Sequence, residues 1–203
     1  MEPGLEAQLA RILQNGPARL AAEEQLTVIT GGTDAGIFHL LGQGFAQWGR
    51  PAACIGVAVD ALVTWPDRPG DGVPLEPHHS HFCLVEGRDW GDETETMYTL
   101  AARLAADCPS LALFANAGEI AVREMQANVA QGREMILLAG SGRYADTVLE
   151  IRKGQQTDDA RLLEIARSGR IIPYDIGQSP SGLVQCIAER LRLGPDARHS
   201  GGS

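Results

Sequence analysis

The sequence predicts an α/β protein, a Rossmann-like three-layer sandwich in which a mainly parallel sheet is flanked by helices. Short apolar runs typical of strands alternate along the chain with longer segments of helical periodicity. The continuous apolar run Ala53–Val59 (ACIGVAV) is typical of a strand that is buried on both faces. Glycine turns follow several strand-like runs, as expected for strand-to-helix connections in such a sheet.

In the N-terminal half, the first predicted helix covers residues 5–24, where apolar residues recur at helical spacing. The β-rich run Leu26–Thr30 predicts the first strand, and the glycine turn after it opens a helix over Gly36–Trp48. Ala53–Val59 is the second strand. Residues 64–80 are rich in Pro and Gly, which break regular structure, so they are predicted to form a long loop.

In the C-terminal half, further apolar runs predict strands at His81–Val85, Leu111–Phe114, Met135–Leu138 and Ile171–Tyr174. Segments with apolar residues at helical spacing predict helices at Thr94–Ala106, Glu119–Gln131, Ala145–Arg152, Asp158–Arg167 and Gly182–Arg192. Because helices separate most of the successive strands, we expect the strands to run parallel.

A chain of 203 residues is long enough for one domain with a full hydrophobic core. We expect a single domain over residues 1–193 and a polar tail over 194–203 that is either disordered or introduced by cloning. No apolar run approaches the roughly 20 residues of a membrane helix, and the acidic, amphipathic N-terminus is unlike a signal peptide. The sequence therefore predicts a cytoplasmic protein without a membrane partner.

The net charge is −9, and Lys153 is the only lysine. Nucleic-acid binding by bulk electrostatics needs clustered Lys and Arg, so nucleic acid is not expected as a partner. An acidic protein can still bind phosphate locally, with backbone N–H groups and a few arginines, which fits a small nucleotide. The cysteines are far apart in the sequence and imply neither a metal site nor a disulfide.

Turns of small residues follow three of the predicted strands, at Gly31–Gly36, Asn116–Glu119 and Gly140–Arg143. In an open parallel sheet these turns lie at the carboxyl edge, where ligands bind. The N–H groups of a helix N-terminus favour phosphate, and glycine lets an anion approach the backbone closely. The turns together predict a phosphate- or nucleotide-binding edge.

Four segments in order, VITGGTDAGIF, LEPHHSHFCLVEG, FANAGEIAV and LLAGSGRYAD, resemble the SLOG superfamily. They look most like the SLOG domain of melastatin-type TRP channels (TRPM) and its prokaryotic, LSDAT-like relatives. The resemblance covers roughly residues 24–175, and its specific parts are GSGRYAD and the Pro-x-His-x-His-Phe segment. It implies a Rossmann-like domain that senses a ligand of the ADP-ribose, cyclic ADP-ribose or NAD class without turnover.

The resemblance, together with the chemistry of individual side chains, assigns the ligand-binding positions. They are Gly31, Gly32, Thr33, Asp34, Gly36, His79, His81, Asn116, Gly118, Glu119, Arg123, Gly140, Ser141, Gly142 and Arg143. Arg143 would clamp a phosphate through its guanidinium group. Asp34 would repel a phosphate directly, so we expect it to cap a helix N-terminus. Arg123 either reaches the same anion or lies on a solvated helix face.

The cluster of His78, His79 and His81 suggests a metal site, but no Cys or carboxylate pattern completes one, so no metal is predicted. Its members either bond loop backbone or line the ligand. No cofactor beyond the nucleotide-type ligand is expected. The expected partner is a second copy of the chain or a fused effector domain.

The alternative function is an N-glycosidic hydrolase of the LOG phosphoribohydrolase type. That branch carries the motif PGG-x-GT-x-x-E, whose Glu is catalytic. Aligned on Gly118, this chain has Val122 at the catalytic position, and valine cannot transfer a proton. Glu119 and Glu124 are the nearby carboxylates that could act instead. A structural paralogue with an empty pocket is a third possibility.

Overall fold

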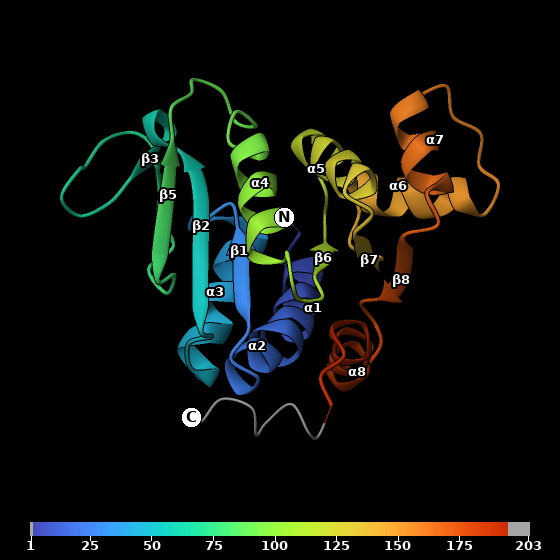
Figure 1. Cartoon of the computed structure of the whole chain (residues 1–203), viewed down its shortest axis with the longest axis horizontal. Helices are drawn as coiled ribbons and strands as arrows, with labels where there is room; N and C mark the ends of the chain where they lie inside the picture. The colour runs from blue at the N-terminus through green and yellow to red at the C-terminus, as the bar shows by residue number, and fades with distance from the viewer. Residues whose placement is uncertain (1, 195–203) are drawn as a thin grey trace.

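The computed structural model describes residues 2–194 of the chain (Figure 1). Its strands are β1 (Thr27–Thr30), β2 (Ala53–Val59), β3 (Val63–Thr64), β4 (Val73–Pro74), β5 (His81–Val85), β6 (Leu111–Phe114), β7 (Glu134–Ala139) and β8 (Ile171–Asp175). Its helices are α1 (Pro3–Leu13), α2 (Arg19–Glu23), α3 (Gly36–Trp48), α4 (Thr94–Leu104), α5 (Glu119–Ala130), α6 (Arg143–Arg152), α7 (Ala160–Arg167) and α8 (Pro180–Leu191). Of the tail predicted over 194–203, all but Gly194 lies outside the described residues.

The strands form two three-stranded parallel sheets, ordered β1-β2-β5 and β6-β7-β8, and β3 pairs with β4. In the first sheet the register places Thr30 beside Gly56, and Gly56 beside Phe82. The predicted α/β class with parallel strands is confirmed, and every major predicted strand is present at nearly the predicted bounds.

The hydrogen bonding divides the expected single sheet in two. Within residues 2–194, no backbone hydrogen bond joins β1 to β6, and Figure 1 shows the two sheets as separate groups. The burial of the strands agrees, since β2 and β7 are buried over most of their length while β1 and β6 are only partly buried. Each sheet therefore has its own buried centre.

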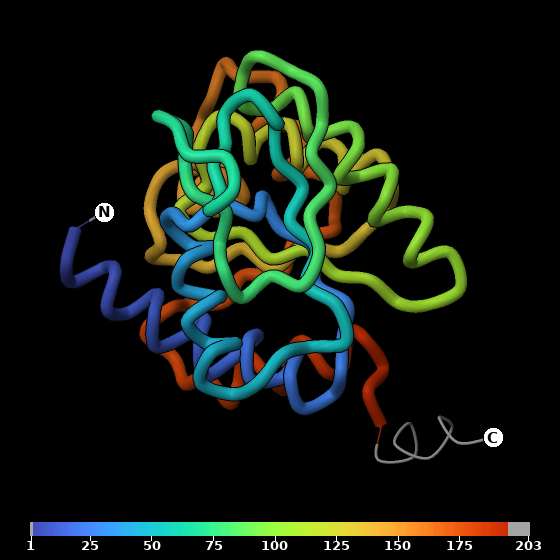
Figure 2. Tube along the Cα trace, turned by 90° about the vertical axis from the view of Figure 1, so that its left-hand side faces the viewer, coloured from blue at the N-terminus to red at the C-terminus, as the bar shows by residue number. Residues whose placement is uncertain are grey.

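Helices cover both faces of each sheet. On the first sheet, Phe45 of α3 packs with Cys54 on one face, and Met97 of α4 packs with Val57 on the other. Figure 2 shows α3 and α4 on opposite sides of these strands. The second sheet is covered by α5, α6 and α7 on one face and by α1 and α8 on the other. These helices and sheets make the three layers.

The N-terminal helix predicted over residues 5–24 is present, but a π-helical turn at Gln14–Ala18 separates α1 from α2. Pro17 lies in this turn and has no N–H to donate, which prevents the regular helical bond. The turn places buried Ala18 against α3, where a methyl group on Gly44 would lie 2.5 Å from the Ala18 Cβ.

Residues 64–80, predicted as a loop, contain little regular structure beyond β4. The end of the loop is anchored to the first glycine turn. The Asp34 N–H donates to the Pro74 carbonyl at 2.7 Å, and the Glu76 N–H donates to the Gly32 carbonyl at 2.9 Å. The long loop therefore returns to the end of β1 before β5 begins.

Candidate functional site

The turns after β6 and β7 meet directly. The Asn116 N–H donates to the Ser141 hydroxyl at 3.0 Å, and the Tyr144 N–H donates to the Ala117 carbonyl at 3.1 Å. Ser141 is fully buried, and its own hydroxyl donates to the Leu138 carbonyl. Because β6 and β7 are paired in parallel, their carboxyl ends bring the second and third predicted turns together, as the sequence analysis expected.

The backbone at this junction is held in an uncommon conformation. Asn116 has φ +46°, Gly142 has φ +89° and Arg143 has φ +56°. The left-handed region suits glycine and is tolerated by asparagine, but it is unfavourable for arginine. Strain of this kind tends to be kept at functional sites, where the surrounding structure imposes it.

The N–H groups of the third turn are used within the chain. The Asp146 carboxylate accepts from the Gly140 N–H at 2.7 Å and from the Gly142 N–H at 2.8 Å. The Ser141 N–H donates to the Leu138 carbonyl at 3.3 Å. The phosphate role expected for Gly140, Ser141 and Gly142 stays a prediction, and a phosphate there would have to displace the Asp146 carboxylate from two of these N–H groups.

The Arg143 side chain lies over the beginning of α5. Its Nη2 atom is 3.2 Å from the position that a Cβ on Gly118 would take, and its Cζ is 3.4 Å from it. Gly118 is the N-cap of α5, and no side chain caps this helix, whereas Asp159 and Ser179 cap α7 and α8. The Arg143 guanidinium forms no ion pair with any residue in 2–194.

This arrangement places positive charge beside positive charge. A helix N-terminus carries partial positive charge and N–H groups without partners inside the helix. An arginine beside it is unfavourable unless an anion contacts both. The junction of the second and third turns is therefore the part of the predicted edge that is best suited to a phosphate.

Glu119, the first residue of α5, is held by a residue of α7. Its carboxylate pairs with Arg161, which also binds Asp159 at 2.8 Å. The hydrogen bond from Arg161 lowers the pKa of Glu119, and one from Tyr144 adds to the effect. An ionised carboxylate held by a guanidinium is poorly placed to orient a ribose or to act as a general acid.

Glu124 is the titratable group on α5 whose pKa is suited to acid–base chemistry. Burial raises the pKa of its carboxyl group to about 7, and the neighbouring Glu93 carboxylate contributes to the rise. Glu93 is itself buried and accepts a hydrogen bond from the Gly91 N–H at 2.7 Å. Val122, at the aligned catalytic position, is 0% exposed in the core.

The segment after β5 was not predicted to lie near the site, but it packs beside α5. Gly91 lies beside α5, where a Cβ would come within 3.3 Å of the Arg123 Nη1 atom. Hydrogen bonds from the Arg88 and Asp89 N–H groups lower the pKa of the Asp92 carboxyl group. The positive charge of Arg123, on an exposed face of α5, makes a smaller contribution in the same direction. The position of this segment at the carboxyl end of a predicted strand was the available signal.

The first turn, Gly31–Gly36, follows β1 and so belongs to the β1-β2-β5 sheet, not to the sheet that forms the junction. A methyl group on Gly31 would lie 2.6 Å from the Phe38 ring, and Gly32 has φ +69°. Thr33 forms a β-bridge with Leu75, and nothing lies within 4 Å of a Cβ on Gly36. Among the described residues, no hydrogen bond joins this turn to either of the others, so its place in one common site stays a prediction.

Asp34 does not cap α3. Its carboxylate bonds the His39 Nδ1 atom at 2.5 Å, and the N-cap of α3 is Ala35, without a side-chain cap. The capping role expected for Asp34 is therefore wrong. The cause is the position of His39 on the first turn of α3, within reach of the Asp34 carboxylate.

The two candidate histidines occupy different environments. The His79 side chain is fully buried and bonds the Glu76 carboxylate and the Thr30 hydroxyl, which leaves it no surface for a ligand. His81 is exposed at the start of β5, where its Nδ1 atom bonds the Ser80 hydroxyl at 2.8 Å. The burial of His79 therefore argues against a direct ligand contact, whereas a ligand role for His81 stays a prediction.

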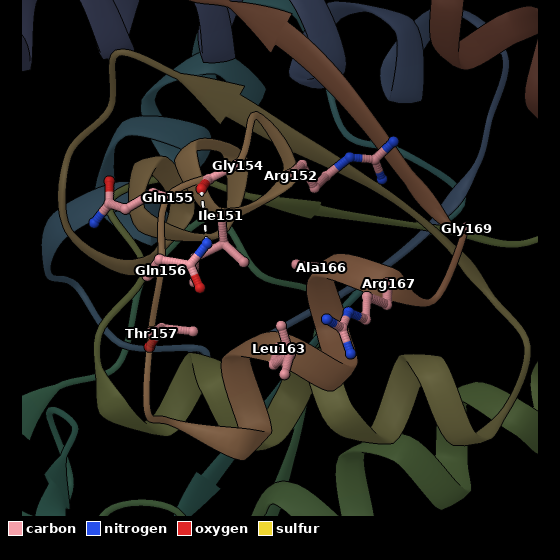
Figure 3. A pocket seen from close by; sticks show the side chains of 10 residues that line it. All are labelled: Ile151, Arg152, Gly154, Gln155, Gln156, Thr157, Leu163, Ala166, Arg167 and Gly169. Carbon is pink, nitrogen blue, oxygen red and sulfur yellow. Dashed lines mark hydrogen bonds between the residues drawn. The ribbon is translucent and has the colours of Figure 1, made fainter.

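Two hollows of the structure lie away from the junction. One hollow of about 480 Å³ lies between α6, α7 and the segment after α6, and Figure 3 shows Gln156 and Arg167 on its two sides. A second hollow of about 490 Å³ lies between α4 and α5. None of the predicted site residues lines either hollow.

Residues 2–194 contain no group of three or more His, Cys, Asp or Glu residues arranged to hold a metal ion. No helix in this part of the chain is both long enough and apolar enough to span a bilayer.

The family model described as "SLOG in TRPM, prokaryote" matches residues 1–185. The chain belongs to this family. This membership confirms the resemblance seen in the four sequence segments, and in this SLOG protein the junction at α5 and α6 is formed by two of those segments, FANAGEIAV and LLAGSGRYAD. No protein of curated function matches the chain.

Several solved structures share the fold. A structural genomics target, TM1055, has a TM-score of 0.61 at 18% identity, over 93% of this chain and 91% of its own. The molybdenum cofactor carrier protein of Chlamydomonas reinhardtii has a TM-score of 0.53 at 14% identity, over 92% and 89%. The molybdenum cofactor binding protein of the phototrophic bacterium Rippkaea orientalis has a TM-score of 0.57 at 15% identity, over 90% and 86%.

Proposed function

We propose that this SLOG protein binds a nucleotide-derived small molecule of the ADP-ribose, cyclic ADP-ribose or NAD class, and that it does so without turnover. The observation that supports the proposal most strongly is the Arg143 guanidinium over Gly118, at the uncapped N-terminus of α5. A phosphate beside both would accept hydrogen bonds from the guanidinium and from the first N–H groups of the helix.

The absence of turnover is proposed from the carboxylates around this position. Val122 is a core residue, and Glu119 is ionised and held by Arg161. Neither can transfer a proton to a leaving base. The bound ligand would then act as a signal, read through a second copy of the chain or a fused effector domain.

The test is a binding measurement with a matched pair of variants. We expect ADP-ribose, cyclic ADP-ribose or NAD to raise the melting temperature of the wild-type chain and to bind by calorimetry. Arg143→Gln should weaken that binding by at least about tenfold, because a charge-assisted hydrogen bond is worth about 1.5–3 kcal/mol. Arg103→Gln, which changes an exposed arginine on α4, should leave it unchanged.

Molybdenum cofactor belongs in the same ligand panel, because two structural neighbours are described as binding or carrying it. If the chain binds that cofactor and none of the nucleotides, the proposed ligand class is wrong and the cofactor takes its place. Equal affinity of Arg143→Gln and wild type for the bound ligand would refute the anion site at α5.

One observation favours the hydrolase as a second candidate. The pKa of Glu124, raised to about 7, is near the value that suits a general acid or base at neutral pH. Incubation with AMP and NAD, followed by chromatography for the released base, tests this function. Release that is lost in Glu124→Gln would establish it, and intact substrate after long incubation would dismiss it.

A further inference from the structure

Glu76 is a buried carboxylate at the end of the long loop, and it is 1% exposed. Burial by itself would raise the pKa of Glu76, but hydrogen bonds from His79 and His78 outweigh it and lower that pKa. The distances are 2.7 Å from each of the two imidazole Nδ1 atoms and 2.9 Å from the His78 N–H. The carboxylate also lies against α3, where a Cβ on Gly42 would be only 2.0 Å from it.

His79 links the Glu76 carboxylate to Thr30, the last residue of β1. The ionised Glu76 carboxylate can only accept, so the His79 Nδ1 atom carries the proton, and in the neutral ring Nε2 is an acceptor. The Thr30 hydroxyl lies 2.6 Å from Nε2, and it is the donor to that atom when the ring is neutral. The same hydroxyl oxygen accepts from the Gly32 N–H at 2.9 Å.

Both backbone groups of Gly32 are therefore tied to Glu76. The Gly32 N–H is held through Thr30 and His79, and the Gly32 carbonyl accepts directly from the Glu76 N–H at 2.9 Å. Gly32 has φ +69°, and a Cβ there would lie 2.7 Å from the Gly56 Cα. Position 32 therefore requires glycine, and both of its backbone polar groups have fixed hydrogen-bond partners.

We propose that Glu76, His79 and Thr30 form a relay of positioning residues that fixes the first turn, Gly31–Gly36, in its ligand-binding conformation. The relay rests on the proposed function, with the first turn as part of the ligand site. His79 and Thr30 are 6% and 7% exposed, so the relay acts through Gly32 rather than by touching the ligand.

The hydroxyl–imidazole–carboxylate order resembles that of a nucleophile and its base. Here the Thr30 hydroxyl is buried and already accepts from Gly32, so no nucleophilic role is assigned to it. The relay is a positioning device, and its test must separate positioning from folding.

The test compares Thr30→Val, which removes the hydroxyl at nearly constant volume, with Thr30→Ser, which keeps it. Thr27→Val, at an exposed position of the same strand, is the control. The readouts are the Gly32 amide resonance by NMR and the affinity for ADP-ribose, both measured below the melting temperature of every variant. We expect Thr30→Val to move the Gly32 resonance and to weaken binding about tenfold, as expected for loss of one buried hydrogen bond.

Thr30→Ser should restore the Gly32 resonance and most of the affinity, and Thr27→Val should resemble wild type. A Gly32 resonance and an affinity that are unchanged in Thr30→Val would overturn the relay. If wild type binds neither ADP-ribose nor the other nucleotides, the proposed function fails, and the relay is then judged on the Gly32 resonance alone.

Discussion

Glu124 is a carboxyl group whose ionisation the folded state opposes. Burial raises its pKa from an ordinary value of 4.5 to about 7, with a further contribution from Glu93. The folded chain therefore holds this proton more tightly than the unfolded chain does. The favourable contribution is present at low pH and is lost as the pH rises from about 4.5 to about 7.

This sign gives a stability prediction. At pH 8, ionisation of Glu124 lowers the free energy of unfolding by up to roughly 3 kcal/mol. Glu124→Gln should raise the melting temperature at pH 8, by on the order of 5 °C, and should change it little at pH 4.5. Calorimetric scans at both pH values measure this, with the exposed Glu95→Gln on α4 as control. A variant that is no more stable than wild type at pH 8 would contradict the prediction.

At the scale of the element, the N-terminus of α5 depends on Gly118. Its φ of −85° is available to any residue, so alanine adds a methyl group without backbone strain. That methyl group would lie 3.2–3.4 Å from the Arg143 guanidinium, which would have to move by a few tenths of an ångström. Gly118→Ala should therefore weaken phosphate-ligand binding while keeping the melting temperature within about 2 °C of wild type.

The measurement is calorimetric titration with ADP-ribose. The matched control is Gly4→Ala on α1, where nothing lies within 4 Å of the added methyl group. Undiminished binding by Gly118→Ala would show that the position of Arg143 over α5 does not matter for the ligand.

Elements were more predictable from the sequence than the contacts between them. Ala53–Val59 and Leu111–Phe114 match β2 and β6 because apolar periodicity is a local property of the chain. The π-helical turn around Pro17 was not foreseen, because a helix with a proline can also simply end there.

The site was predictable to the level of its turns. The meeting of Asn116 with Ser141 follows from strand order and the strand-to-helix pattern. The partners of Asp146 and Asp34 did not follow, because a short carboxylate side chain binds whichever donor the tertiary fold brings within about 3 Å. Thr30 and Glu76 lie 46 positions apart in the numbering, and only the return of the long loop brings them into one network.

At the scale of the whole molecule, two buried centres lie in one chain. The first sheet packs around β2 and the second around β7. The helices join the halves, since α1 packs on α3 of the first sheet and contributes to the core beneath the second. A ligand that bridged the first turn and the α5 junction would therefore link two separately hydrogen-bonded sheets.

The lack of bonds between β1 and β6 has a consequence for solvent. Each of these strands is an edge strand, so every second amide proton points away from its paired strand and has no acceptor in another strand within residues 2–194; we expect such protons to exchange without opening of the fold. In deuterated buffer, those protons should be replaced far sooner than the ones in the middle of β2 and β7. Mass spectrometry of rapidly quenched peptides would show this, and equally slow uptake in all these strands would mean that the two sheets join in solution.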